Sequence, residues 1–402
     1  MDREAPLRTF PEQSEAGWKW LPYALLLAVT FALYGATLCF DFVWDDILYI
    51  HRNYRIHRLD LPHLYAFWTG TYLGHYAPVQ HTFLALLYHF FGVEPFGYHL
   101  AQVLVHAASA CLLFFVLQKM EMPRVAWVAS LLFAVHPTSI ETVAWVSETK
   151  STLAFFFFLL SVWFFIRLRE RERPREQWTD GVLAGLFLIL SVLSKINTVV
   201  APAIFLLYDY RQGASFRTLR WRSLGCFFLI SAAFTAIHLG AFHGSPQRLE
   251  GVYYGGPGVH LMNLPLLLSF YVRMAVFPYP VSAWEMFPAQ EQLNWLVALG
   301  WAGLLAVALL LLRTSRSTQF WALWFVVFLL PVLQIVPFPI WVADRYLYIP
   351  GIGLFVLVGR LFSHAWDRAV SPGLRWSLQC AMVAAIVVLG WRTLDHLPAW
   401  RN

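Results

Sequence analysis

The sequence has little charge. Only 13% of its 402 residues are Asp, Glu, Lys or Arg, whereas 59% are hydrophobic and the mean hydropathy is +0.57. Soluble globular domains carry about 25% charged residues, so a water-soluble protein is excluded. We predict an all-α polytopic membrane protein, and the 34 Phe and 19 Trp suit packing inside a bilayer and at its edges.

Cysteine is also scarce. All four cysteines lie in apolar runs, where they are typical of buried small hydrophobic residues; they are Cys39, Cys111, Cys226 and Cys380. We therefore expect no disulfide framework. The net charge of +6 does not indicate a nucleic-acid partner, because the basic residues gather in a few loops.

The sequence lacks tandem repeats, low-complexity tracts and a convincing signal-peptide cleavage site. Its first apolar run, from about Trp20 to Phe40, contains no charge and has the roughly twenty residues that cross a bilayer. We interpret it as a retained first span, preceded by a cytoplasmic tail at residues 1–19. Further apolar runs follow at about residues 97–117, 125–135, 152–166, 181–193, 198–207, 224–242, 264–277, 295–312, 320–336, 347–361 and 376–389.

Loop charge assigns the two sides of the membrane. Basic residues cluster at 119–124, 167–175, 211–222, 313–316 and 360–375, and the positive-inside rule places these loops in the cytoplasm. The sides then alternate only if the short run 264–277, which carries Arg273, does not cross. We predict that it is a re-entrant or interfacial helix on the outer side. About eleven transmembrane helices remain in one domain, residues 20–391, followed by a short outer tail at 392–402.

The first outer loop, residues 41–96, is long for a connection. Its segment Leu59–Trp68 is typical of an amphipathic helix on the membrane surface, and long loops on rigid scaffolds commonly carry function. The predicted topology also places Asp45–Asp46, residues 136–150, Lys195 and Asp344–Arg345 on this outer face.

Two adjacent carboxylates, Asp45 and Asp46, follow the first span behind Trp44. Charged groups at a membrane are costly unless they are solvated, paired or used. One interpretation is a wet interfacial loop anchored by Trp44, and the other is a catalytic pair. We expect no required cofactor, with Mg²⁺ or Mn²⁺ at the two carboxylates as the alternative.

Later segments add polar residues on the same face. His136 and Glu141 join two apolar runs and act either as an ordinary helix terminus with a solvated charge or as functional groups. Lys195 either snorkels to the headgroups or binds an anionic one. Arg345, with neighbouring tyrosines, suits either an interfacial anchor or a lipid phosphate. The histidines of the outer loop lack zinc spacing with a third ligand nearby, and His75 is a candidate for substrate binding.

Six short motifs, in this order, resemble the GT-C glycosyltransferase superfamily. The nearest resemblance is to the transmembrane module of the tetratricopeptide-repeat-containing O-mannosyltransferases and their bacterial relatives, over nearly the whole chain. The motifs are Trp-Asp-Asp at 44–46, His-Pro at 136–137 with Glu-Thr-Val-Ala-Trp-Val at 141–146, Lys150, Ser-Lys at 194–195, Leu-Tyr-Asp-Tyr at 207–210, and Asp-Arg-Tyr-Leu-Tyr-Ile-Pro at 344–350.

The resemblance implies an inverting glycosyltransferase. It would move a sugar, with a mannose-like hexose expected, from a polyprenyl-phosphate carrier to a hydroxyl acceptor on the periplasmic or lumenal face. Asp45, with Asp46, matches the acidic motif whose first carboxylate takes the acceptor proton. The cations that stabilise the leaving lipid phosphate, and the tyrosines beside them, match Lys150, Lys195, Arg345, Tyr346 and Tyr348. Residues expected to contact the acceptor or the sugar are Trp44, His75, His81, His136 and Glu141.

The chain departs from the family pattern at two motifs. Ser139 replaces a second His after His136-Pro137, and Ser151 replaces an acidic residue that often follows the lysine. The repeat domain that commonly follows the last span is missing, so we expect a separate repeat-containing partner, or a glycan or lipid acceptor in place of a protein. We expect a bacterial inner-membrane location.

Other functions stay open as alternatives. A lipid transporter would place its ionisable groups at mid-membrane. A lipid-linked oligosaccharide ligase or polymerase would rely on outer-loop arginines, without a need for the Trp-Asp-Asp motif. A non-catalytic membrane scaffold would keep the fold alone.

Overall fold

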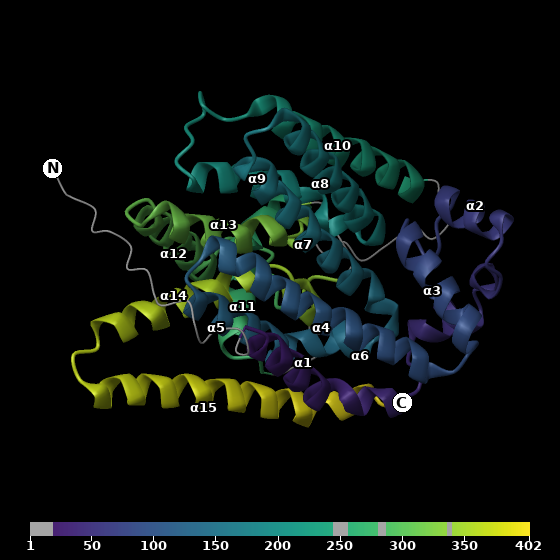
Figure 1. The fold of residues 1–402 in the computed structure, drawn as a ribbon, viewed down its shortest axis with the longest axis horizontal. Helices are drawn as coiled ribbons and strands as arrows, with labels where there is room; N and C mark the ends of the chain where they lie inside the picture. The colour runs from purple at the N-terminus through teal and green to yellow at the C-terminus, as the bar shows by residue number, and fades with distance from the viewer. Residues whose placement is uncertain (1–18, 244–255, 280–286, 336–339) are drawn as a thin grey trace.

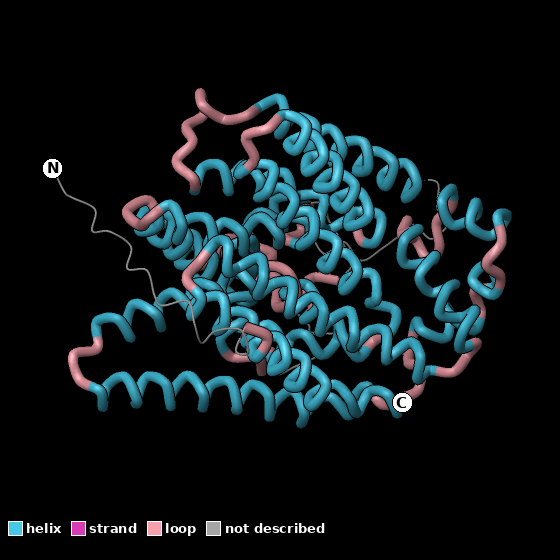
Figure 2. Tube along the Cα trace, viewed as in Figure 1, coloured by secondary structure: helices cyan, strands magenta, loops and turns pink. Residues whose placement is uncertain are grey.

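The computed structural model describes residues 19–243, 256–279, 287–335 and 340–402, and in these ranges it is a bundle of helices without a β-strand (Figures 1 and 2). The predicted all-α class is confirmed. The α-helices are α1 (Leu21–Tyr34), α2 (Leu61–Thr69), α3 (Pro78–Phe91), α4 (Pro95–Met120), α5 (Pro123–Val135), α6 (Ile140–Ala144), α7 (Thr149–Glu170), α8 (Pro174–Ser194), α9 (Ala201–Arg211), α10 (Trp221–His243), α11 (Pro257–Val276), α12 (Trp295–Leu311), α13 (Arg316–Leu329), α14 (Gly351–Arg368) and α15 (Pro372–His396).

Proline and capping residues set many helix starts. Several helices begin at a proline, whose fixed φ and missing N–H suit the first turn; they are α3, α4, α5, α8, α11 and α15. In α2, the predicted surface helix of the outer loop, Asp60 is the N-cap and accepts a hydrogen bond from the backbone N–H of His63 at 3.0 Å. The predicted helix is therefore confirmed, whereas its position on the membrane surface stays a prediction.

The protein is an integral multi-pass membrane protein. In the described ranges seven helices are long and apolar enough to cross a bilayer, and three more apolar helices are shorter. The first of the seven, Leu21–Cys39, is the predicted first span. The count of about eleven crossings, and the side on which each loop lies, stay predictions.

Helix α7 runs through the centre of the core, and charged residues lie at both of its ends. Its aromatic face packs deep in the bundle, where Phe165 stacks on Phe205 of α9 with ring centroids 4.2 Å apart. At 1.5 Å per residue its 22 residues span about 33 Å. Lys150 lies in its first turn and Arg167 and Arg169 in its last. We call the end of the bundle near Lys150 the site end and the end near Arg167 and Arg169 the basic end.

The basic end joins loops that are far apart in the sequence. Arg211 and Arg360 both bind the Glu121 carboxylate, at 2.8 and 2.7 Å, and Arg169 binds Asp209 at 2.7 Å. Loops that the positive-inside rule assigned to one side therefore do lie together.

Helix α11 is longer than the sequence indicated. We considered the apolar run 264–277 too short to cross the bilayer, but the helix covers 20 residues and is long enough. The argument from length is therefore wrong. Both of its ends nevertheless contact segments predicted on the outer side: His260 stacks on Trp341 at 4.8 Å, and the Ala275 carbonyl lies 3.1 Å from Nε2 of His136. These contacts favour a helix that lies along the outer face.

The cysteines are less buried than predicted. All four are free, but three are exposed on the surfaces of apolar helical segments and Cys111 is only partly covered, so their predicted burial is wrong. Hydropathy cannot separate a core-facing from a lipid-facing position in such a segment. The segment 392–402, predicted as a tail, is helical to Trp400 and packs on the bundle through Leu397.

Candidate active site

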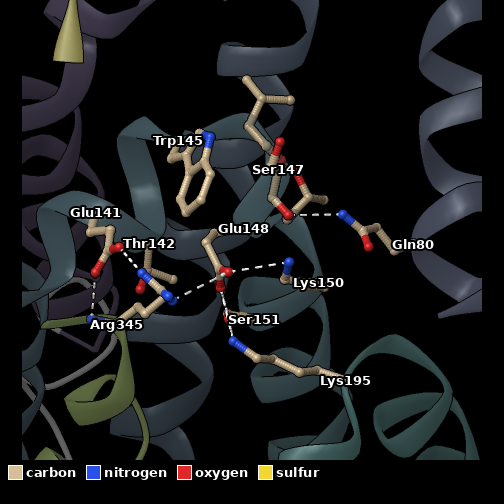
Figure 3. Close-up of polar contacts among 12 residues, drawn as sticks. Gln80, Glu141, Thr142, Trp145, Ser147, Glu148, Lys150, Ser151, Lys195 and Arg345 are labelled. Carbon is tan, nitrogen blue, oxygen red and sulfur yellow. Dashed lines mark hydrogen bonds and ion pairs between the residues drawn. The ribbon is translucent and has the colours of Figure 1, made fainter. Parts of the chain in front are cut away.

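The site end is built by a broken helical connection between α5 and α7. The chain leaves α5 at His136, forms the single turn of α6, becomes extended at Trp145, and restarts in the 3₁₀ turn Val146–Glu148, here η5. The break turns Glu141 and Glu148 toward the same point, where Arg345 of the turn Asp344–Leu347, here η8, meets them (Figure 3).

Glu148 is the centre of a buried ion cluster. Its carboxylate, 2% exposed, lies 2.9 Å from Nζ of Lys195, 3.3 Å from Nζ of Lys150 and 3.7 Å from Nε of Arg345. Ser151 donates a hydrogen bond to it and accepts one from Lys195 at 2.7 Å. Three cations from α7, η8 and the end of α8 thus share one carboxylate.

Glu141 supplies the second carboxylate. It pairs with the guanidinium of Arg345 and accepts the Arg345 backbone N–H at 2.9 Å. Burial raises the pKa of Glu141, and Arg345 opposes that rise. Burial lowers the pKa of Lys195 to about 8 despite the neighbouring Glu148. Three cations against two carboxylates give the cluster a net charge of about +1 with all five ionised.

A small cavity of about 20 Å³ adjoins this cluster, which is roughly the space of one water molecule. Lys195, Arg345 and Ser151 form its polar side, and Ala154 and Phe328 belong to its apolar side. The other lining residues are Asn197, Thr198, Tyr346, Tyr348, Ile349 and Pro350. A phosphate group fits into this cavity only after the lining side chains move apart. The cavity has a cationic side and an apolar side.

The structure separates the two adjacent aspartates. Asp46 is fully buried and accepts hydrogen bonds from the backbone N–H of Ser147 at 2.6 Å, from the Ser147 hydroxyl, and from the backbone N–H of Val43 at 3.2 Å. Burial raises its pKa to about 7. These contacts fasten the outer loop to η5. Asp45 is half-buried and has no hydrogen bond or ion pair to any residue that the structure describes.

Tyr49 connects Asp45 with the cations. Its ring lies under Nζ of Lys150 at 5.6 Å. Burial raises the pKa of the Tyr49 phenol; Lys150 opposes the rise and Asp45 adds to it, so both charges lie near this side chain. Its hydroxyl is buried without a hydrogen-bond partner in the described ranges.

His75 faces the cluster from the outer loop. A tight turn presents it: Tyr72 and His75 exchange two backbone hydrogen bonds around Leu73 and Gly74, which have φ of +48° and +75°. The side chain is exposed. Desolvation, together with the positive charges of Lys150 and Lys195, holds its pKa well below the usual range.

The other predicted contact residues lie around rather than in this cluster. Both ring nitrogens of His136 have partners, Thr138 and the Ala275 carbonyl, and its ring packs on Phe355. His81 is buried against Tyr49 and bonds the Ala77 carbonyl at 2.7 Å. Tyr348 lines the cavity while its hydroxyl lies 2.8 Å from Nδ1 of His106.

The site also contains residues that the sequence did not single out as site residues. They are Glu148, Ser151, Tyr49, Trp145 and Trp400. Glu141 and Glu148 are seven residues apart, which equals two helical turns, and this spacing was the available signal for Glu148. No sequence signal indicated Trp400. Among the described residues no group of three or more His, Cys, Asp or Glu side chains is arranged to hold a metal.

Solved membrane proteins share this architecture. The crystal structure of ArnT from Cupriavidus metallidurans bound to undecaprenyl phosphate gives a TM-score of 0.53 at 14% identity, covering 92% of this chain and 64% of that one. An Archaeoglobus fulgidus oligosaccharyltransferase tethered with an acceptor peptide gives 0.51 at 15% identity, covering 96% and 55%. The likeness shows the fold alone, and it is the predicted GT-C fold.

Sequence comparison narrows the class. Residues 75–238 match the family described as dolichyl-phosphate-mannose-protein mannosyltransferase. Similar proteins include the protein O-mannosyl-transferases tmtc2 of Xenopus laevis, 32% identical over 198 residues, and TMTC2 of Homo sapiens, 33% identical over 198 residues; each match covers 45% of this chain and 23% of the relative. The chain therefore spans under a quarter of their length. The predicted resemblance to the O-mannosyltransferases is therefore confirmed for this part of the chain.

Proposed function

We propose that the protein is an inverting glycosyltransferase that moves a hexose, mannose-like in kind, from a polyprenyl-phosphate carrier to a hydroxyl acceptor. The observation that carries this proposal is the cluster of Lys150, Lys195 and Arg345 around Glu148, beside a cavity with an apolar side. Clustered cations are what a departing phosphate requires, and the apolar side suits its lipid tail.

The net charge of the cluster favours a donor whose lipid carrier is a monophosphate over one whose carrier is a diphosphate. A sugar phosphodiester carries one negative charge, which matches the net +1 of the cluster. When the bond from the anomeric carbon to the phosphate oxygen breaks, the leaving polyprenyl phosphate gains a second negative charge, and the cations stabilise that gain. A diphosphate-linked donor would bring excess negative charge before any bond breaks. ArnT, which shares the fold, has been crystallised with undecaprenyl phosphate.

Asp45 is the proposed base. The acceptor oxygen attacks the anomeric carbon, its proton passes to the Asp45 carboxylate, and the phosphate leaves from the opposite side of the sugar, so the configuration inverts. Asp45 suits this role because it has no protein partner in the described ranges. Asp46 positions it by fixing the loop to η5. We place the site end on the periplasmic or outer side, because the arginine-rich loops gather at the other end.

The test is mannose transfer by the purified full chain in lipid nanodiscs. Polyprenyl-phosphate mannose is the donor, and mass spectrometry detects products formed from water, glycosides and a Ser/Thr peptide. Asp45→Asn should lower turnover at least 100-fold while donor affinity stays within threefold. Arg345→Gln should weaken donor binding itself. A wild-type protein that binds no polyprenyl phosphate and consumes no donor would refute the proposal in favour of a scaffold.

A further inference from the structure

Three tryptophans from distant parts of the chain meet beside Asp45. Trp44 packs edge-on against Trp145, with ring centroids 5.6 Å apart, and against Trp400, 5.0 Å apart; Trp145 and Trp400 lie 5.9 Å apart. They come from the outer loop, from the break before η5 and from the last turn of the described chain, Leu397–Trp400. We call them the tryptophan platform.

The backbone of Trp44 in the tryptophan platform is strained. Trp44 has a φ of +49°, a conformation that costs a bulky residue about 1–2 kcal/mol. The backbone N–H of Asp41 binds the Arg401 carbonyl at 3.0 Å, which fixes the loop to the end of the chain. Strain that persists in this way commonly marks a functional position. Despite both ring contacts, Trp44 stays 60% exposed.

The platform lies between the two halves of the proposed chemistry. Asp45 follows Trp44 in the chain, and the guanidinium of Arg345 lies 5.7 Å from the ring centroid of Trp145. Trp145 is 92% buried, and its indole N–H has no hydrogen-bond partner in the described part of the chain. A buried donor without a partner requires an explanation, and a ligand on the neighbouring exposed ring of Trp44 would supply one.

We infer that the tryptophan platform is the acceptor subsite and that its ligand is a carbohydrate, a pyranose stacked on Trp44 with one hydroxyl at Asp45. A pyranose has an apolar face of C–H groups that matches an aromatic ring, and hydroxyls at its rim. This inference rests on the proposed function and names its acceptor class.

The surroundings favour a sugar over a peptide. Peptides in extended form are recognised largely through backbone hydrogen bonds, but four of the amides near the platform are already used. The N–H groups of Val43 and Ser147 bind Asp46, that of Asp46 binds the Val43 carbonyl, and that of Ile47 binds the Trp44 carbonyl. What remains is aromatic surface with one free carboxylate, which matches the apolar face and the rim hydroxyls of a pyranose.

The test measures sugar binding before catalysis. Wild-type protein in nanodiscs is titrated with methyl glycosides of mannose, glucose and N-acetylglucosamine, and saturation-transfer NMR reports which ring protons contact the protein. At least one glycoside should bind through one face. Trp44→Ala should weaken that binding at least tenfold, Trp44→Phe less than threefold, and Trp68→Ala, an exposed tryptophan of α2, not at all.

Transfer kinetics separate the possible failures. Trp44→Ala should raise KM for the glycoside at least tenfold, whereas Trp68→Ala should leave both this KM and donor hydrolysis unchanged. Three results would overturn the subsite. The glycosides bind equally well to wild type and to Trp44→Ala, or none of the glycosides binds, or sugar is transferred only to a Ser/Thr peptide. A loss of donor affinity in Trp44→Ala as large as the loss of glycoside affinity would also overturn it, by showing that the ring serves the donor. Tryptophan-dependent glycoside binding without any donor consumption would sustain the subsite and refute the transferase.

Discussion

The titration of Lys195 gives a direct test of the cation cluster. Its ammonium donates to Glu148 at 2.9 Å and to Ser151 at 2.7 Å, and burial lowers its pKa to about 8. Below that pH the side chain is charged and the cluster carries net +1. Above it the lysine is neutral, and the attraction for the phosphate falls. We therefore expect kcat/KM for the donor to decline as the pH rises through about 8.

The size of the decline follows from the contact that is lost. A hydrogen bond from a charged donor contributes about 1.5–3 kcal/mol, which corresponds to roughly a 10- to 150-fold change in rate. Unfolding does not explain such a loss. Between about pH 8 and 10.5 the unfolded lysine binds more protons than the folded one, so this residue makes the fold more stable as the pH rises.

The assay is donor turnover between pH 6 and 10 under kcat/KM conditions. The matched control is Lys195→Arg, which keeps the charge with a pKa above 12 and should give a profile that stays level to pH 10. Glu148→Gln removes the anion that raises the pKa of Lys195, so its decline should begin at lower pH. A wild-type profile without an alkaline decline, or an unchanged decline in Lys195→Arg, would refute the reasoning.

Three further predictions concern single side chains. Tyr49→Phe keeps the ring under Lys150 and should lower kcat severalfold, whereas Tyr49→Leu should also raise the donor KM; wild-type kinetics in Tyr49→Phe would exclude a role for the hydroxyl, and equal kinetics in the two variants would exclude one for the ring. Asp46→Asn leaves one acceptor oxygen where two serve Ser147 and Val43, so one of these residues loses its acceptor, which should cost about 1–3 kcal/mol of stability, read as a lower midpoint of thermal unfolding. Gly353→Ala places a Cβ 2.4 Å from the Trp321 carbonyl, where α14 meets α13, and should lower that midpoint, whereas Gly373→Ala, in open space, should not.

Composition and local pattern were enough to predict the class and several elements. A charge-free run predicted the first span, and the amphipathic segment Leu59–Trp68 predicted α2. Both signals are local, because they depend on residues that are neighbours in one helix. The resemblance to GT-C enzymes depended on the order of short motifs, and it identified Lys150, Lys195 and Arg345 before their distances were known.

The parts that were missed depend on contacts between distant segments. Hydropathy cannot tell which side of an apolar segment faces lipid, so Cys39 and Cys226 were wrongly predicted as buried. It also underestimated α11, because Pro257 and His260 lie before its apolar run. The spacing of Glu148 from Glu141 was its only sequence signal; the packing of α7, α8 and η8 reveals that it binds three cations.

Glu148 explains how a cation cluster can exist at a membrane edge before a substrate arrives. Uncompensated buried charges cost several kcal/mol each, so Lys150, Lys195 and Arg345 need a counter-ion in the empty site, and the Glu148 carboxylate provides it. A phosphodiester must then share these cations with Glu148 instead of finding them free. The sharing limits ground-state affinity, while the second charge that forms on the leaving phosphate draws the cations most strongly as the bond breaks. Stabilisation that grows along the reaction in this way accelerates catalysis rather than only tightening binding.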